Sequence, residues 1–420
     1  MVGYRDNRVQ CMKNKRRFRR IIAFLGMMIV GYIPSAVGQE YDSLNFRPMR
    51  HFVHGLGVEV RPEYIFPTHP FLRGENPEMK LIRGAFSTHV KYTLRYRPGS
   101  MAEHIYGGVY QGIGFGRYSF GEPEQIGDPV VFYLFQGARI ARFCPWLSFN
   151  YEWNFGLSTG WKPYDAEYNE FNKMVGSKTN AYINTNFYLH WKLTPRLSLT
   201  SGVTLAHFSN GNTSFPNAGV NTIGAKVGLE YNFYRKEDLL ADTDWDRASI
   251  PAFHPHVSYD FVFFGSWRRK GVYVYDGQVP SPEAYPVFGI NFNPMYNLNY
   301  KFRLGLSLDG VYDGSANIYV KDEMVSGNLE KSDIIRPALG KQFSLGVSGR
   351  IEYVMPFFTV GVGMGTNLVG QGDFKSFYQV LILKIAMSRD TFLHVGYNLQ
   401  QFREPNFLML GVGFRFNNKS

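Results

Sequence analysis

The hairpin at residues 207–221 gathers three residue types that together can transfer an acyl group. His207 and Ser209 stand two positions apart, and Asn221 opens the next extended segment. A serine hydroxyl becomes a nucleophile when a neighbouring base takes its proton and a third group orients that base. Residues two apart on a strand share one face and lie about 7 Å apart, within bridging reach of their side chains. The pattern predicts Ser209 as nucleophile, His207 as base and Asn221 as orienting group.

The loop inside this hairpin offers hydrogen-bond donors for a developing oxyanion. The candidates are Asn210, Gly211, Asn212 and Asn217, because backbone N–H groups and side-chain amides stabilise a tetrahedral intermediate. A histidine beside a serine also fits a competing interpretation, a polar cap at a barrel rim. No metal-ligand constellation accompanies the hairpin, so we expect neither a metal nor another cofactor.

The segments on either side of the loop alternate between two faces. The row that ends in His207 and Ser209 also contains the apolar residues Leu199, Val203 and Leu205. The row that begins at Asn221 continues with Ile223, Ala225, Val227 and Leu229. In a membrane barrel the apolar row faces lipid and the small polar row faces the lumen. We therefore expect the three candidate residues on the outer wall of a barrel.

The same period-2 alternation recurs along the whole chain and predicts an all-β, transmembrane antiparallel β-barrel protein. Glycine runs such as 112/114/116 alternate within these segments and are expected to face a crowded lumen. If the chain ends of a barrel are periplasmic, loop 210–219 follows the seventh strand and is extracellular. The expected strands lie near residues 53–65, 84–97, 104–117, 129–142, 146–158, 181–193, 197–209, 220–233, 255–267, 284–298, 302–312, 342–354, 357–366, 377–387, 391–402 and 407–416.

The two sets of eight segments look like a duplication. Residues 132–140 align without gaps on residues 343–351, and Pro216-Asn217 matches Pro405-Asn406. The second copy has Gln401 and Arg403 where the first has His207 and Ser209. Only the first copy therefore keeps the reactive pair.

The duplication predicts four regions in the chain. They are a signal peptide at 1–38, an eight-stranded barrel carrying the site at 39–235, a polar linker at 236–252 and a second eight-stranded repeat at 253–420. The long linker favours two tandem barrels. One fused sixteen-stranded barrel is the alternative, because two barrels in one chain are uncommon.

The N-terminus has the features of a secretory signal peptide. A basic stretch precedes the 13-residue apolar run Ile21–Ile33, and small residues follow before Gln39. Residues 1–38 carry eight of the 45 basic residues and one of the 34 acidic ones, so the rest of the chain has a net charge of only +4. Nucleic-acid binding thereby loses its compositional support. Beyond the signal only Cys144 remains, so no disulfide framework is expected.

The string H-x-S-N-x₅-P-N-x-G, from His207 to Gly219, resembles that of the lipid A 3-O-deacylase (acyloxyacyl hydrolase) family of outer-membrane barrels. The resemblance covers roughly residues 50–235. It implies His207 as base, Ser209 as nucleophile and Asn217 as an oxyanion-hole residue, assisted by the backbone amide near Asn212. The family's acidic triad member is a Glu, whereas this chain has Asn221 at that position.

The resemblance implies an esterase in the outer membrane of a Gram-negative bacterium. Its substrate would be lipid A of lipopolysaccharide, from which it would remove the 3-O-linked 3-hydroxyacyl chain. Two alternatives remain at this stage. One is a non-catalytic, porin-like or structural barrel with a relic site, which Asn221 and the unreactive second copy favour. The other is an outer-membrane phospholipase.

Overall fold

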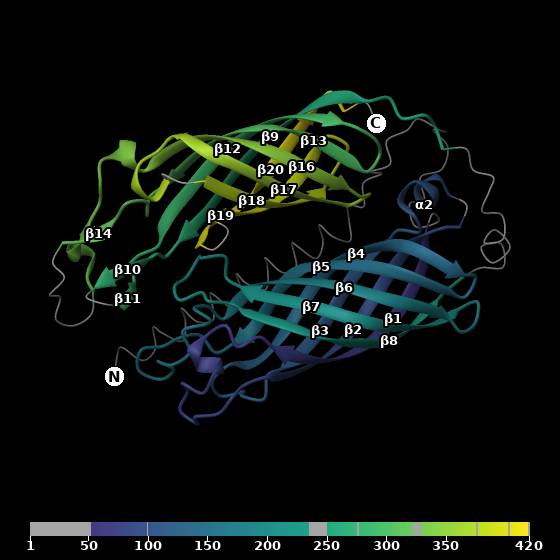
Figure 1. Ribbon diagram of the computed structural model, residues 1–420, viewed down its shortest axis with the longest axis horizontal. Coiled ribbons are helices and arrows are strands. Elements are labelled where there is room, and N and C mark those ends of the chain that lie inside the picture. The colour runs from purple at the N-terminus through teal and green to yellow at the C-terminus, as the bar shows by residue number, and fades with distance from the viewer. Residues whose placement is uncertain are drawn as a thin grey trace, which may run out of the picture.

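The computed structural model describes residues 52–418 apart from 99, 235–249, 275–276, 322–328, 375–376 and 402–403 (Figure 1). The expected signal peptide, most of the expected linker and Arg403 lie outside the described residues. None of the described helices is long and apolar enough to cross a membrane.

The first eight strands form a closed antiparallel barrel in which each strand pairs with the next along the chain. Strand β8 returns to pair with β1, so that Leu56 faces Tyr231 in the register. The strands are β1 (Phe52–Ile65), β2 (Gly84–Tyr96), β3 (Tyr110–Ser119), β4 (Gly127–Cys144), β5 (Leu147–Trp161), β6 (Thr179–Lys192), β7 (Leu197–Ser209) and β8 (Val220–Asn232).

A second closed barrel of eight strands follows, and β20 pairs with β9 to close it. Its strands are β9 (His256–Arg268), β12 (Tyr285–Asn297), β13 (Phe302–Asp313), β16 (Phe343–Val354), β17 (Phe358–Val369), β18 (Phe377–Ala386), β19 (Thr391–Gln400) and β20 (Glu404–Phe416). The chain therefore forms two tandem barrels, and the fused sixteen-stranded alternative is wrong. The aligned segments 132–140 and 343–351 lie in the fourth strand of each barrel.

Small elements outside the barrels escaped the alternation pattern. The expected strand 104–117 begins only at Tyr110, because helix α2 (Met101–Tyr106) precedes it. Ser100 caps the start of this helix, and Gly107 ends it with a positive φ of 73°. Beside the second barrel, β10 (Gly271–Val274) pairs with β11 (Gly277–Pro280), and β14 (Tyr319–Val320) pairs with β15 (Ile334–Ile335).

The inside of the first barrel is filled by charged and aromatic side chains. Glu59 is buried and forms ion pairs with Arg61 at 2.7 Å, Lys226 at 2.9 Å and Lys91 at 3.1 Å. Glycine leaves room for this packing: a Cβ atom on Gly114 would lie 2.2 Å from the ring of Tyr133. Eight-stranded barrels are just wide enough for side chains to fill them.

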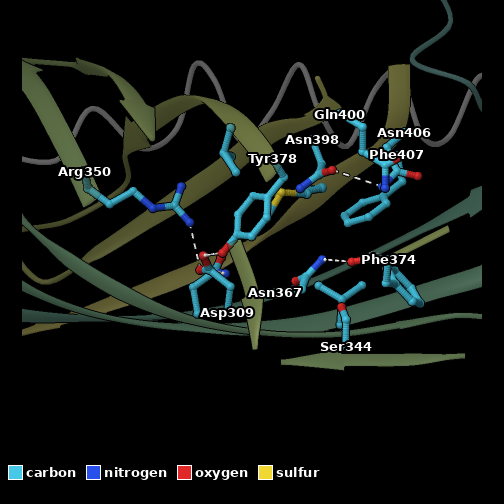
Figure 2. A pocket seen from close by; sticks show the side chains of 14 residues that line it. Asp309, Ser344, Arg350, Asn367, Phe374, Tyr378, Asn398, Gln400, Asn406 and Phe407 are labelled. Atoms are coloured by element: carbon cyan, nitrogen blue, oxygen red, sulfur yellow. Dashed lines mark hydrogen bonds and ion pairs between the residues drawn. The ribbon is translucent and has the colours of Figure 1, made fainter. Parts of the chain in front are cut away.

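The inside of the second barrel is filled in the same way (Figure 2). Arg350 and Tyr378 both point toward Asp309 and donate hydrogen bonds to its carboxylate at 2.8 and 2.6 Å. The remaining cavity has a volume of about 20 Å³, which holds about one water molecule.

The two barrels lie side by side and point in the same direction (Figure 1). Toward the end where β1 starts, the Tyr151 hydroxyl donates to the Tyr353 hydroxyl at 3.2 Å. At the opposite end, the Asn212 side chain donates to the backbone carbonyl of Asn406 at 3.3 Å. The two barrels therefore contact each other at both ends.

Candidate functional site

His207, Ser209 and Asn221 form one hydrogen-bonded chain. His207 Nε2 lies 2.9 Å from Ser209 Oγ, and His207 Nδ1 lies 2.7 Å from Asn221 Oδ1. All three residues are partly buried. The residues singled out from the sequence as nucleophile, base and orienting group are thus in direct contact.

Strand geometry accounts for this arrangement. His207 and Ser209 end β7 on the same face, and the β7–β8 register places Asn221 directly opposite His207. Directly opposed residues have Cβ atoms about 4.5–5.5 Å apart, which one hydrogen bond between their side chains can span. The same outward face continues through Leu205 and Val203, which are 40% and 47% exposed.

The acceptor on Asn221 selects the tautomer of His207. Asn221 presents its carbonyl oxygen to Nδ1, and a carbonyl oxygen only accepts hydrogen bonds. Nδ1 therefore carries the ring proton, which leaves Nε2 unprotonated and facing the Ser209 hydroxyl. This is the form of the ring that a general base needs.

A close approach of the backbone makes room for the ring. Gly219 has a φ of 73°, and a Cβ atom there would lie 3.2 Å from His207 Cε1 and 3.6 Å from Ser209 Cβ. A side chain at this position would press on the reactive pair. The sequence pattern included Gly219, but only the structure gives it this role.

The four loop residues expected to donate to an oxyanion differ in their surroundings. The Asn210 backbone N–H donates to Asn217 Oδ1 at 2.9 Å, and the Asn210 side chain donates to the Ser214 carbonyl at 2.7 Å. Asn217 Nδ2 donates to Asn212 Oδ1 at 3.3 Å and keeps a second N–H. No described residue accepts from the Gly211 backbone N–H. Gly211 and Asn217 therefore retain donors, while the backbone N–H and one side-chain N–H of Asn210 are engaged within the loop.

A neighbouring loop of the first barrel carries a histidine with an altered pKa. His69 accepts a hydrogen bond from the Phe71 backbone N–H at 3.2 Å and so caps the turn η2 (Pro70–Leu72). Burial lowers the pKa of His69 below its usual value, and the positive charges of Lys173 and Arg73 lower it further. The neutral form, which alone can accept from Phe71, is favoured.

No group of three or more potential metal ligands occurs among the described residues. In the second barrel, Gln401 follows β19 as an exposed turn residue with a φ of 49°. The described part of this barrel brings no His–Ser pair to the corresponding rim.

Two protein-family models match the chain. The one described as lipid A 3-O-deacylase (PagL) matches residues 88–230, and the one described as acyloxyacyl hydrolase, C-terminal domain, matches residues 257–418. Together they cover more than two thirds of the 420 residues. The chain belongs to the lipid A 3-O-deacylase family.

Members of this and other outer-membrane families appear among similar solved structures. Neisserial surface protein A is 9% identical, with 43% of this chain and 97% of that chain covered and a TM-score of 0.29. The outer membrane enzyme PagL is 13% identical, with 41% and 97% covered and a TM-score of 0.26. Outer membrane protein Omp33 of Acinetobacter baumannii is 8% identical, with 87% and 100% covered and a TM-score of 0.17. No curated protein sequence matches the chain.

This member of the lipid A 3-O-deacylase family is an outer-membrane β-barrel protein. The first family match spans the whole hairpin with His207, Ser209 and Asn221, and the second spans nearly all of the second barrel. The two matches therefore follow the two closed barrels.

Proposed function

We propose that the protein is an outer-membrane esterase that removes the 3-O-linked 3-hydroxyacyl chain of lipid A. The observation that carries this proposal is the chain Ser209–His207–Asn221 at the lipid-facing rim of a closed barrel. A nucleophile on the outer wall meets substrates that are themselves membrane lipids. With periplasmic chain ends, this rim lies in the outer leaflet, where lipopolysaccharide is located.

The first half of the reaction forms an acyl-enzyme. Ser209 Oγ attacks the ester carbonyl carbon while His207 Nε2 takes the hydroxyl proton. The tetrahedral intermediate collapses, the bond to the sugar oxygen breaks, and the protonated His207 returns its proton to that oxygen. The Gly211 backbone N–H and the second N–H of the Asn217 side-chain amide are the candidate donors for the oxyanion.

The second half releases the acyl chain. A water molecule gives its proton to His207 Nε2 and attacks the acyl carbon, and Ser209 leaves with the proton that His207 then returns. The products are a free 3-hydroxy fatty acid and lipid A with one hydroxyl exposed. Throughout, Asn221 holds the ring orientation without carrying a charge.

Mass spectrometry of lipid A tests this function directly. Cells that express the wild-type protein are expected to contain lipid A lighter by one 3-hydroxyacyl group, whereas Ser209→Ala restores the full mass. Ser201→Ala is the matched control, since Ser201 lies on the same strand away from the site. Identical acylation patterns for wild type and Ser209→Ala would reject the proposal.

The filled barrel interiors argue against a porin-like function. Ion-paired side chains around Glu59 occupy the inside of the first barrel, and the cavity inside the second barrel has a volume of only about 20 Å³. We expect no single-channel conductance from the purified protein in planar bilayers. A phospholipase would instead release fatty acids from glycerophospholipid vesicles, and we expect release only when lipopolysaccharide is supplied.

A further inference from the structure

The loop that follows Ser209 is held by both barrels. On the side of its own barrel, the Ser214 hydroxyl donates to the Gly176 carbonyl at 2.8 Å, and the Gly219 backbone N–H donates to the Met174 carbonyl at 3.1 Å. These contacts fix the second half of the loop. The first half, next to Ser209, is instead contacted by the second barrel.

Two contacts from the second barrel and one from the neighbouring strand β10 reach this loop. The Asn212 side chain donates to the backbone carbonyl of Asn406. A Cβ atom on Gly211 would lie 3.3 Å from Leu408 Cδ1. A third contact joins the start of β10 to the loop, where a Cβ atom on Gly271 would lie 2.6 Å from the ring of Phe215. The second barrel thus contacts the loop at Gly211 and Asn212, and β10 contacts it at Phe215.

The carbonyl that receives Asn212 is itself held in place from inside the second barrel. Asn406 is buried, and its side chain donates to Asn398 Oδ1 at 3.1 Å (Figure 2). Arg268 donates to Asn406 Oδ1 at 2.7 Å and forms an ion pair with Asp313 at 3.1 Å. A residue whose side chain is anchored by two polar partners, one of them itself held by an ion pair, presents its carbonyl in a fixed position.

A relay of hydrogen bonds runs from this carbonyl to the peptide beside the nucleophile. Asn212 donates to Asn406 and accepts from Asn217 Nδ2, while Asn217 Oδ1 accepts from the Asn210 backbone N–H. Asn210 directly follows Ser209. Gly211 and Asn212 both have a φ of 62°, a left-handed conformation that is strained for most residues and is retained when surrounding contacts fix it.

We propose that the second barrel, which lacks a reactive pair in its described part, is a positioning element for the site on the first. Its Asn406 carbonyl and Leu408 side chain hold Gly211 and Asn212, and through them Asn217 and the oxyanion donors. Asn212 is a positioning residue in this scheme. This inference rests on the proposed esterase function and assigns a task to the second copy within it.

A double-mutant cycle across the two barrels tests the coupling. Gly211→Ala is expected to lower kcat roughly tenfold, because alanine is strained at this φ and its Cβ presses on Leu408. If the contact positions the loop, Leu408→Ala relieves part of this loss. The kcat of the double variant is then at least about threefold higher than the value obtained by multiplying the effects of the two single substitutions on kcat. Leu410→Ala, on the same outward face of β20, is the matched control and is expected to combine with Gly211→Ala multiplicatively.

Asn212→Gly tests the relay, since glycine keeps the left-handed backbone while removing the amide. The kcat is normalised to the amount of protein whose nucleophilic serine is labelled by a covalent probe. We expect this normalised kcat to fall about tenfold, with KM for lipid A nearly unchanged. Simple loss of folded protein would reduce the labelled fraction and leave the normalised kcat unchanged. Multiplicative effects in the Gly211/Leu408 cycle, or an unchanged normalised kcat in Asn212→Gly, overturn the inference.

Hydrogen–deuterium exchange separates this inference from the proposed function. Leu408→Ala and Asn212→Gly are expected to speed exchange at the Asn210 amide at least about threefold, and Leu410→Ala to leave it unchanged. This measurement does not depend on enzymatic activity. A wild-type protein that leaves lipid A intact would therefore reject the esterase function without rejecting the positioning role of the second barrel. Unchanged exchange in both variants would reject the positioning role of the second barrel, whatever the activity of the wild type.

Discussion

Replacing Asn221 by leucine removes the acceptor that orients the base and leaves the size of the side chain nearly unchanged. The structure gives a hydrogen bond of 2.7 Å between His207 Nδ1 and Asn221 Oδ1 in a partly buried setting. Leaving such a donor unpaired costs about 1–3 kcal/mol. If the cost falls on the productive orientation of the ring, kcat decreases about 5- to 150-fold.

Asn221→Asp perturbs the same contact in the opposite direction. A carboxylate accepts the same proton in a charge-assisted hydrogen bond, which is roughly twice as strong as a neutral one. It also stabilises the imidazolium that forms as Ser209 attacks. A gain of about 1–2 kcal/mol corresponds to an increase in kcat of about 5- to 30-fold. The expected order of activity is therefore Asp, then Asn, then Leu.

The assay measures release of 3-hydroxy fatty acid from purified lipid A by protein in detergent micelles, with rates normalised to the folded protein. Ile223→Leu, the next outward position on β8, is the control and is expected to behave as wild type. An Asn221→Leu variant within twofold of the wild-type rate would refute the orienting role. An Asn221→Asp variant that is folded but slower than wild type would refute the argument about charge.

Three further predictions concern the fold around the site. Because the pKa of His69 is lowered, the folded state favours the neutral ring. The capping contact to Phe71 is fully present above pH of about 6.5 and weakens as pH falls through the lowered pKa. The protection factor of the Phe71 amide, which is its intrinsic exchange rate at each pH divided by the observed rate, should therefore fall on acidification, and His69→Asn should abolish this fall. Glu59→Gln removes the carboxylate that forms ion pairs with three buried cations. It should lower the free energy of unfolding, measured by urea titration in micelles, by about 3–5 kcal/mol. Val203→Arg places a charge on the lipid-facing wall and should cost about 2–4 kcal/mol in the same titration, whereas Val203→Ala should cost far less.

Local alternation predicted most of the fold, because a strand with one face in lipid and one in a packed lumen must repeat every two residues. It placed β7 at 197–209 as observed and put His207 and Ser209 on the outer face. It misplaced the start of β3, since helix α2 depends on a capping serine and a terminal glycine that carry no periodic signal. It also missed β10, β11, β14 and β15, which are too short to alternate.

Local sequence was enough to show which residues share a face and which residue types gather in the hairpin, since both are local properties of the chain. Whether one barrel or two would form depended on the pairing of β8 with β1, which joins residues far apart in the sequence. The orientation of His207 by Asn221, the close approach of Gly219 and the contact of Asn212 with Asn406 likewise depend on register and on packing between strands. These non-local distances exist only after the strands have paired into closed barrels and the barrels have come into contact, so they follow from the folded chain and not from local pattern.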